Sequence, residues 1–594
     1  MNRIKRLLGR NGFLPAILLV IVATQGLSLW IATSQLSVTR DEPANMAAGL
    51  EYWETGSSMR YNVNPPLVKL WATLPLYFRD HIQAPRLSVE YRDSERERHE
   101  FTLGTKLMDS LGKEFFRSLV SARRMCIWFA IVGTLGIYAL AGLWLNERAS
   151  VMAASIWAFN PITLGFGPLI SCDIPAASIG CWAVYCGVCA YRNPSIGAIA
   201  IFGCMLGLAV LTKLTWILAF PLTIVIVVAL AVTQGARSTN RKRVVAVSKV
   251  APGLLMAFLF AWLVFTAGYR FQGMFRPLAE YSFVSNLLTG NNKSENRFAH
   301  SMMADFPVPI PSPMLMGIDQ QWQDFDDPRY CYLAGEWQRG GWYYYYFIAL
   351  MVKLPLGLIL LLVFAMRKLR DYREACWVCM PIIVTCFVLV SLKTNMNEHT
   401  RYLWLILPQI IVVASLAFEE SNKKWNFGVT ALWVWSVFTG IWSFPCGISY
   451  FNELATGMRG GHQVLAGSNV DWGHGWITAR QWLERNVTQH PVVVIPSFRD
   501  NLSIYGFQTS AQAPTHIEDP NPMVNVLIAV DERLNLQRDR DFPGPGHSMM
   551  NLAGCCVEVY EMHLHELQQL NWHWVVGIGD KPPSTSNRVT PRSR

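Results

Sequence analysis

Apolar runs of about twenty residues alternate with polar stretches along most of this 594-residue chain. A helix needs roughly 20 residues to cross the ~30 Å hydrocarbon core of a bilayer, so each run is long enough for one crossing. The pattern therefore predicts an all-α polytopic membrane protein with about 11 transmembrane helices. We expect them near 12–32, 125–145, 149–166, 174–191, 196–212, 214–233, 251–269, 343–366, 375–392, 401–418 and 425–445.

The polar stretches between these runs differ in charge, which predicts an orientation. With the N-terminus in the cytoplasm, every short internal loop carries Lys or Arg, as the positive-inside rule requires. The basic residues concerned are Arg148, Arg192, Arg237, Arg367 and Lys423. Three long segments, about 33–124, 270–342 and 446–594, then face the outside. The runs 44–53 and 65–77 inside the first segment are amphipathic, so we expect external loop helices lying on the membrane surface.

The last external segment has a different pattern. Short β-branched runs at 492–495, 524–530 and 557–560 indicate strands, and 472–485 indicates a helix. We therefore predict a transmembrane domain at 1–445 and a small extracytoplasmic α/β domain at 446–580. The tail at 581–594, rich in Pro, Ser and Arg, is expected to be disordered.

Composition supports a membrane protein, because 52% of the residues are hydrophobic and only 15% are charged. The net charge of +10 is explained by the basic internal loops, so we do not expect nucleic acid as a partner. Of the 13 cysteines, four lie in predicted external segments, where one or two disulfides remain open: Cys331, Cys446, Cys555 and Cys556.

Acidic candidates for chemistry lie just outside the predicted spans. Asp41 and Glu42 follow the first span, where such a pair is usually a solvated helix flank. Asp173 lies in the short external turn before the fourth span, and an Asp ahead of Pro175 is also a good helix cap. Function is favoured by their shared side of the membrane, which places the carboxylates at one end of the helical bundle.

Cationic candidates follow the same topology. Lys213 ends a helical hairpin on the external side and Arg401 opens the tenth span, although either side chain alone is as well explained by snorkelling to the interface. Lys353 lies inside the predicted span 343–366. A charge there is costly against lipid, so we expect it to face the bundle interior.

Cations beside a carboxylate at a membrane surface suit one reaction in particular. Transfer of a sugar from a polyprenyl phosphate needs cations for the departing phosphate and a base for the acceptor hydroxyl. Phosphate leaves without a general acid, unlike the leaving group of a glycosidase. Direct displacement inverts the anomeric centre.

Several motifs together resemble the membrane glycosyltransferases of the GT-C fold, especially the protein O-mannosyltransferase and aminoarabinose transferase group, glycosyltransferase family 39 and relatives. The resemblance runs from about residue 12 to 485. The motifs are Asp41-Glu42, Asn64-Pro65-Pro66-Leu67 with Lys69, Asp173-Ile174-Pro175, Gly340-Gly341-Trp342-Tyr343-Tyr344, Lys353-Leu354-Pro355, Arg401-Tyr402-Leu403 and Ser468-Asn469-Val470-Asp471-Trp472-Gly473.

The resemblance implies roles for individual residues. It makes Asp41 the catalytic acidic residue, with Glu42 and Asp173 in support. Candidates for the donor phosphate are Lys69, Lys213, Lys353 and Arg401, and candidates for substrate binding are Asn64, Tyr344, Glu398, His399 and Tyr402. The family usually has His where this chain has Asn64, so Asn64 can act only as a neutral hydrogen-bonding group.

The sequence therefore predicts an inverting glycosyltransferase of the bacterial cytoplasmic membrane, moving a sugar from a polyprenyl-phosphate donor to a lipid or protein acceptor on the outer face. No cofactor or metal is expected, with the three acids as ligands of a divalent cation the minor alternative. Two other classes remain open: an ion-coupled transporter, and a non-sugar transferase that modifies envelope lipids.

Overall fold

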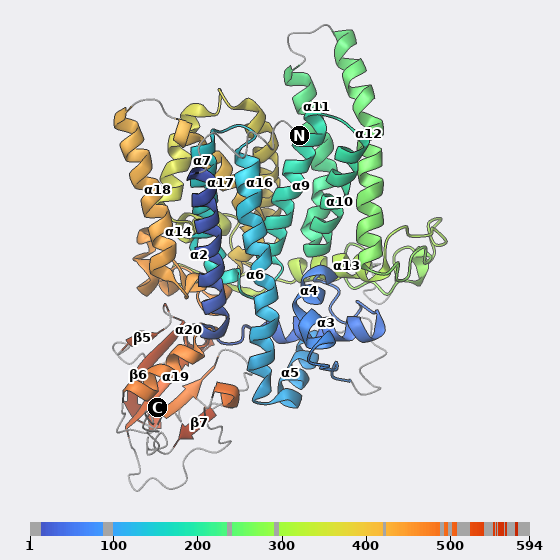
Figure 1. The fold of residues 1–594 in the computed structure, drawn as a ribbon. Helices are drawn as coiled ribbons and strands as arrows, with labels where there is room; N and C mark the ends of the chain where they lie inside the picture. The colour runs from blue at the N-terminus through green and yellow to red at the C-terminus, as the bar shows by residue number, and fades with distance from the viewer. Residues whose placement is uncertain are drawn as a thin grey trace, which may run out of the picture.

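The computed structural model describes residues 13–86, 99–234, 240–289, 296–419, 423–486, 492–496, 502–505, 507, 523–539, 550–552, 554, 556–563, 565–566 and 576–579. Figure 1 shows a bundle of roughly parallel helices with two additions at one end, the group α3–α5 and a C-terminal sheet. Both additions therefore lie on the same side of the bundle, the lower side in this view.

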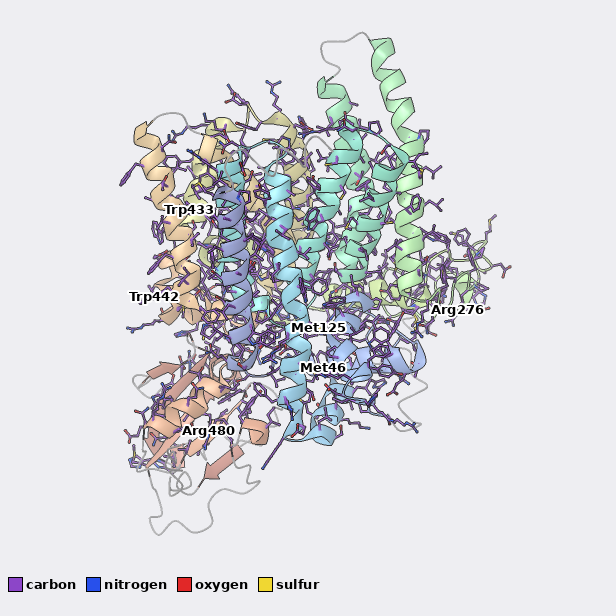
Figure 2. All side chains as sticks on the ribbon, viewed as in Figure 1. Met46, Met125, Arg276, Trp433, Trp442 and Arg480 are labelled. Atoms are coloured by element: carbon purple, nitrogen blue, oxygen red, sulfur yellow. The ribbon has the colours of Figure 1, made fainter. Side chains whose placement is uncertain are left out.

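Seven helical segments in the described part of the chain are long and apolar enough to cross a membrane. They are Leu14–Gln35 in α2 (Phe13–Gln35), Glu114–Ala141, which is α6, Asp173–Arg192, which is α9, Leu214–Ala231 in η2 (Leu214–Leu218) and α11 (Ala219–Gln234), Ala251–Gly268 in α12 (Asn240–Gly268), Arg373–Lys393, which is α16, and Thr400–Glu419 in η6 (Thr400–Ile406), α17 (Leu407–Ala414) and η7 (Ser415–Glu419). Large apolar side chains such as Trp442, 75% exposed on α18 (Lys423–Ser443), project outward from the bundle (Figure 2). The protein is a multi-pass membrane protein.

The predicted count of eleven spans is not confirmed. The run at 149–166 breaks into α7 (Glu147–Ala158) and α8 (Pro161–Phe166), because the Asn160 side chain caps α8 by accepting the Ile162 N–H. The run at 343–366 forms α14 (Tyr345–Lys353) and α15 (Leu356–Ala365), bent by 107° at Pro355, which has no N–H to continue the helix. If this bent pair is counted as one span, the described residues contain eight candidate spans. The run at 196–212 is the shorter α10 (Ile196–Thr212).

Three helices cover the lower end of the bundle beside α6: α3 (Glu42–Thr55), α4 (Pro66–Phe78) and α5 (Glu100–Leu111). They share a buried apolar cluster that includes Met46, Leu50 and Leu107. The α3–α4 contact depends on Gly49, since a Cβ there would lie 2.5 Å from the Lys69 carbonyl oxygen. The amphipathic runs predicted at 44–53 and 65–77 are thus helices, and their apolar faces are buried against protein.

A second surface segment links the helices of the bundle. It contains α13 (Ser312–Asp326) and a hairpin of β1 (Tyr330–Leu333) and β2 (Glu336–Arg339). Gly341 after the hairpin has a φ of +67°, and a Cβ there would lie 1.8 Å from Asn397 Oδ1, so only glycine fits. This contact fixes the start of α14 against the 394–400 turn.

The C-terminal sheet has five strands in the order β5-β6-β4-β3-β7, with β3–β4 parallel and the other pairs antiparallel. The strands are β3 (Val492–Ile495), β4 (Met523–Ala529), β5 (Met550–Leu552), β6 (Val557–His563) and β7 (Val576–Gly579). Strands therefore lie at the three β-branched runs. The accompanying helices are α19 (Trp476–Arg485) and α20 (Val530–Asp539).

Candidate functional site

Four charged side chains from distant parts of the sequence meet at the lower end of the bundle. Arg401 Nη1 lies 2.9 Å from Asp41 Oδ2 and 3.9 Å from Asp173 Oδ2, and Lys213 Nζ lies 2.8 Å from Asp173 Oδ1. The four residues, which we call the charge cluster, alternate in sign. The Asp173 side chain is almost fully buried, whereas those of Asp41, Arg401 and Lys213 are 12–14% exposed. The cluster is thus reachable from its Asp41 and Lys213 ends.

Hydrogen bonds hold Asp41 against the turn that carries Asp173. Asp41 directly precedes α3, whose first turn contains Pro43. The Asn45 side chain, one turn into α3, donates to the carbonyl oxygens of Asp41 and Ile170. The two acids converge because one amide group bridges their segments.

Glu42 has a different position from Asp41. Its carboxylate is fully buried and pairs with Arg123 of α6, and it also accepts the N–H groups of Thr39 and Ile170. Arg123 donates in addition to the carbonyl oxygens of residues 33, 36 and 37. Because both carboxylate oxygens of Glu42 accept hydrogen bonds from protein groups, Glu42 supports the loop rather than facing a substrate.

Aromatic rings hold the two cations of the charge cluster. The Arg401 guanidinium lies 4.4 Å from the Trp472 ring centroid, and Lys213 Nζ lies 5.5 Å from that of Tyr402. Cation–π contacts of this kind orient a cation without neutralising it. Arg401 Nε is also buried and donates to no acceptor among the described residues.

Lys69 and Asn64 lie near the charge cluster, on the side of Cys172. Lys69 Nζ donates to the Tyr61 carbonyl oxygen at 2.6 Å, and the lysine interacts electrostatically with Cys172. Burial lowers the pKa of Lys69 to about 7, against the opposing effect of Glu100 and Glu51. Asn64 Oδ1 lies 3.6 Å from the Cys172 sulfur. Neither side chain touches the four clustered charges.

Lys353 is buried, as its position in a predicted span requires, but it is not in the charge cluster. Its Nζ donates to the carbonyl oxygens of Ile448 and Asn469, both at 2.8 Å, and lies 4.3 Å from the Phe451 ring centroid. The lysine therefore joins the end of α14 to the loop after α18. This placement gives Lys353 a structural position.

The remaining substrate-binding candidates divide into two groups. His399 packs edge-on against Tyr402, and its Nδ1 lies 2.8 Å from Ser468 Oγ. Burial and the nearby Arg401 hold the pKa of His399 well below its ordinary value, so the imidazole is neutral. Burial and Asp531 raise the pKa of Glu398. These residues border the cluster, whereas Tyr344 is 39% exposed and packs edge-on against Tyr343 at the surface.

Sequence reasoning missed several groups at the site. Arg123 was one, because only the three-dimensional fold places it opposite Glu42. Trp472 was another, because it was not among the candidate residues although its ring packs against Arg401. The signal that could have found Trp472 was its position inside a motif shared with the resembled family.

Metal-ligating side chains do not gather at the charge cluster in the described part of the chain. Each carboxylate there is paired with a cation, and Glu42 faces Arg123. Within the described residues, three such side chains come together at Asp471, His474 and Cys556. Cys555 lies outside the described residues.

Comparison with protein families places part of this chain beside a known group of enzymes. Residues 106–264 match the family model for dolichyl-phosphate-mannose-protein mannosyltransferase. The matched segment runs from α5 to α12 and includes Asp173 and Lys213. The resemblance predicted from the sequence motifs is confirmed by this match, which supports a glycosyltransferase. A comparison with curated protein sequences gave no match.

Two solved structures are similar to this chain over most of its length. ArnT from Cupriavidus metallidurans bound to undecaprenyl phosphate is 12% identical with a TM-score of 0.44, over 91% of this chain and 97% of that chain. The Archaeoglobus fulgidus oligosaccharyltransferase in its apo form is 11% identical with a TM-score of 0.42, over 81% of this chain and 59% of that one.

Proposed function

We propose that the protein is an inverting glycosyltransferase that uses a polyprenyl-phosphate sugar on the outer face of the bacterial cytoplasmic membrane. The observation that carries this proposal is the charge cluster of Asp41, Arg401, Asp173 and Lys213 at one end of a membrane-spanning bundle. A family match over 106–264 supports the same reaction class.

Asp41 is the proposed base. Only its Oδ2 contacts Arg401, so Oδ1 is available to accept the proton of the acceptor hydroxyl. The hydroxyl oxygen attacks the anomeric carbon, the bond from that carbon to the phosphate oxygen breaks, and the phosphate leaves with the bonding electrons. Attack from the opposite side of the leaving group inverts the anomeric centre.

Arg401 and Lys213 are the proposed partners of the departing phosphate. Charge-assisted bonds from Arg and Lys to phosphate are strong, and they strengthen as negative charge develops on the leaving oxygen. Asp173 lies between the two cations and is buried, so its role is to hold both of them in fixed positions. Glu42, Lys69 and Lys353 act through the scaffold in this proposal.

An apolar cavity beside the charge cluster suits the lipid part of the donor. It has a volume of about 220 Å³ and lies between α9, α10, α11 and α16. Trp216, Cys386 and Leu405 are among its lining residues, and Cys386 is close enough to Lys213 to interact electrostatically. A prenyl chain entering here leaves its phosphate at the two cations.

The test uses full-length protein purified in detergent and a panel of labelled polyprenyl-phosphate sugars, with peptide and lipid acceptors in separate reactions. We expect transfer from at least one donor, with inverted anomeric configuration in the product. Binding of a donor lipid without transfer of its sugar to any acceptor, together with substrate flux across proteoliposomes, would favour a transporter and refute the proposal.

A further inference from the structure

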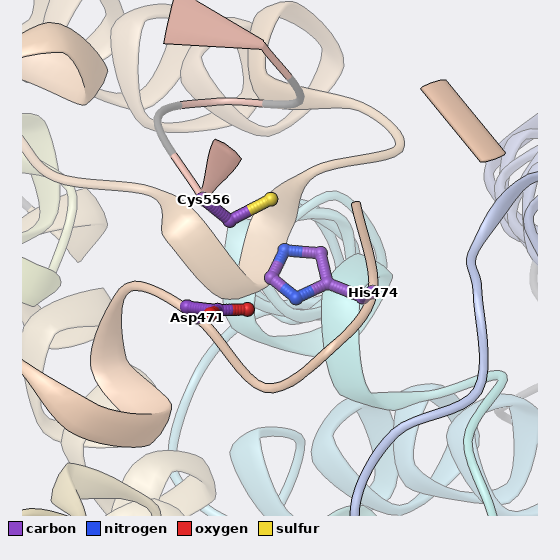
Figure 3. Close-up of side chains that lie close together, drawn as sticks. All are labelled: Asp471, His474 and Cys556. Carbon is purple, nitrogen blue, oxygen red and sulfur yellow. The ribbon is translucent and has the colours of Figure 1, made fainter. Parts of the chain in front are cut away.

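Three buried metal-ligating side chains meet where the loop after α18 contacts the C-terminal sheet. Asp471 and His474 belong to that loop, and Cys556 directly precedes β6. One ligand atom from each residue lies within 4.8 Å of the others, and the exposed fractions are 6%, 1% and 0%. Figure 3 shows the imidazole of His474 between the carboxylate of Asp471 and the sulfur of Cys556.

A carboxylate, an imidazole and a thiol are an unusual set of side chains for a buried contact. Burying an imidazole and a carboxylate beside a thiol costs free energy unless their polar atoms are satisfied. His474 Nε2 bonds to Ser449 Oγ at 2.9 Å, whereas His474 Nδ1 has no hydrogen-bond partner among the described residues. An apolar side chain would pack here without this cost, so the set is better explained by a ligand.

We propose that Asp471, His474 and Cys556 bind a zinc ion that joins the C-terminal sheet to the membrane-spanning part of the protein. Zinc takes thiolate sulfur, imidazole nitrogen and carboxylate oxygen at ~2.0 to 2.3 Å in tetrahedral geometry, which puts ligand atoms about 3.5 Å apart. Contraction from 4.8 Å is within reach of small side-chain rotations. The Cys556 thiol releases its proton to solvent on binding, and a water molecule completes the coordination.

The backbone around the proposed zinc site connects it to the charge cluster. Trp472 lies between the two loop ligands in sequence, and its ring packs against Arg401 at 4.4 Å. The Ser37 N–H donates to the His474 carbonyl oxygen, and the Arg40 N–H donates to that of Trp472. The ion therefore fixes the loop that supports both Arg401 and the segment before Asp41.

A disulfide is the competing use of Cys556. Cys446 packs in the same apolar cluster as Cys556 and, in an oxidising compartment, a bond between them would remove the thiolate ligand. A disulfide there would leave His474 Nδ1 without a hydrogen-bond partner among the described residues. Mass spectrometry of the non-reduced protein distinguishes the two, because a disulfide-linked peptide containing Cys556 would overturn the proposal.

The test is metal binding by tag-free, full-length protein in detergent. The protein is stripped with a chelator, exposed to Zn²⁺ or Co²⁺ and desalted, and its metal content is measured by elemental analysis. We expect one ion per chain and, with Co²⁺, a thiolate-to-metal charge-transfer band in the near ultraviolet. Cys556→Ser and His474→Ala should weaken Zn²⁺ binding by about a hundredfold or more and abolish the band.

Cys331→Ser is the matched control, because Cys331 is also buried and lies in another part of the fold. It should leave both readouts unchanged. If Cys556→Ser fails to fold, Asp471→Asn keeps the shape of the side chain and its bond to Gly473, and should still weaken Zn²⁺ binding. Folded wild-type protein that binds no zinc, or that binds it equally well in all these variants, refutes the site.

Discussion

Asp41 and Glu42 are adjacent in sequence and have opposite surroundings. The Asp41 carboxylate is 12% exposed and has one oxygen on Arg401, whereas the Glu42 carboxylate is fully buried and has protein donors on both oxygens. A carboxylate with a spare oxygen at an accessible edge can take a proton from a substrate. A carboxylate whose hydrogen-bond partners all belong to the protein stabilises the fold. Removing one member of such a buried ion pair is strongly destabilising.

The largest effect separating the two acids should come from Asp41→Asn. The amide cannot act as a base, and loss of general base catalysis costs about 10² to 10⁴ in rate. We therefore expect kcat to fall about a thousandfold in the sugar-transfer assay, with the thermal midpoint changed by little. Asp80→Asn is the matched control, because Asp80 pairs with Arg79 on the same end of the molecule and is outside the cluster. Unchanged turnover in Asp41→Asn would remove this residue from the mechanism.

Glu42→Gln should show the reverse pattern. Arg123 would be left buried without its counter-charge, which costs about 3 to 5 kcal/mol. We expect a clear fall in the thermal midpoint and in the yield of folded protein, with kcat per folded molecule reduced far less than in Asp41→Asn. The double variant Glu42→Leu with Arg123→Met should recover part of the stability. A Glu42→Gln protein that is stable but inactive would contradict the scaffold role.

Variants of Lys213 and Arg401 test whether the charge cluster binds the phosphate of the donor. A charge-assisted hydrogen bond is worth about 1.5 to 3 kcal/mol, so Lys213→Met should raise the KM for the donor roughly tenfold to a hundredfold. Arg401→Lys keeps the charge and loses the planar group on Trp472, and should lie between Lys213→Met and wild type. Arg117→Met on α6, where the side chain is 87% exposed, serves as control. Equal KM values in all variants would exclude a phosphate role for the cluster.

The last prediction concerns pH and Lys69. Its pKa is about 7 in the fold, below the ordinary 10.5, so between these values the unfolded chain binds a proton that the folded protein lacks. Stability should therefore rise with pH across this window, by at most about 1.4 kcal/mol per pH unit, and the penalty should be complete below pH 7. Lys69→Met should make the thermal midpoint less dependent on pH between pH 7 and pH 9. A slope unchanged by this substitution would place the titration elsewhere.

The sequence predicted the parts of this molecule that depend on local chemistry. Apolar length located seven of the predicted spans, and amphipathic spacing located α3 and α4, because both properties are carried by neighbouring residues. It did not predict the break at Asn160-Pro161, where a capping side chain outweighs the apolar run. Topology put Asp41, Asp173, Lys213 and Arg401 at the same membrane surface, and the structure brings these four together.

Residues whose positions depend on long-range packing could not be predicted. Lys353 and Lys69 were expected at the donor phosphate because they are cations in suggestive motifs, yet each donates to backbone carbonyl groups of a distant or neighbouring loop. The sequence does not record which carbonyls are left without partners by the fold. Arg123, inside α6, was not a candidate from the sequence, yet the fold places it against Glu42.

The most direct measurement of the central claim is single-turnover transfer with a labelled polyprenyl-phosphate sugar already bound. The account predicts that Asp41→Asn binds the donor as tightly as wild type and transfers its sugar about a thousandfold more slowly. Lys213→Met should bind the donor weakly and transfer the fraction that it does bind. Wild-type transfer rates in Asp41→Asn, or loss of donor binding there with normal binding in Lys213→Met, would contradict it.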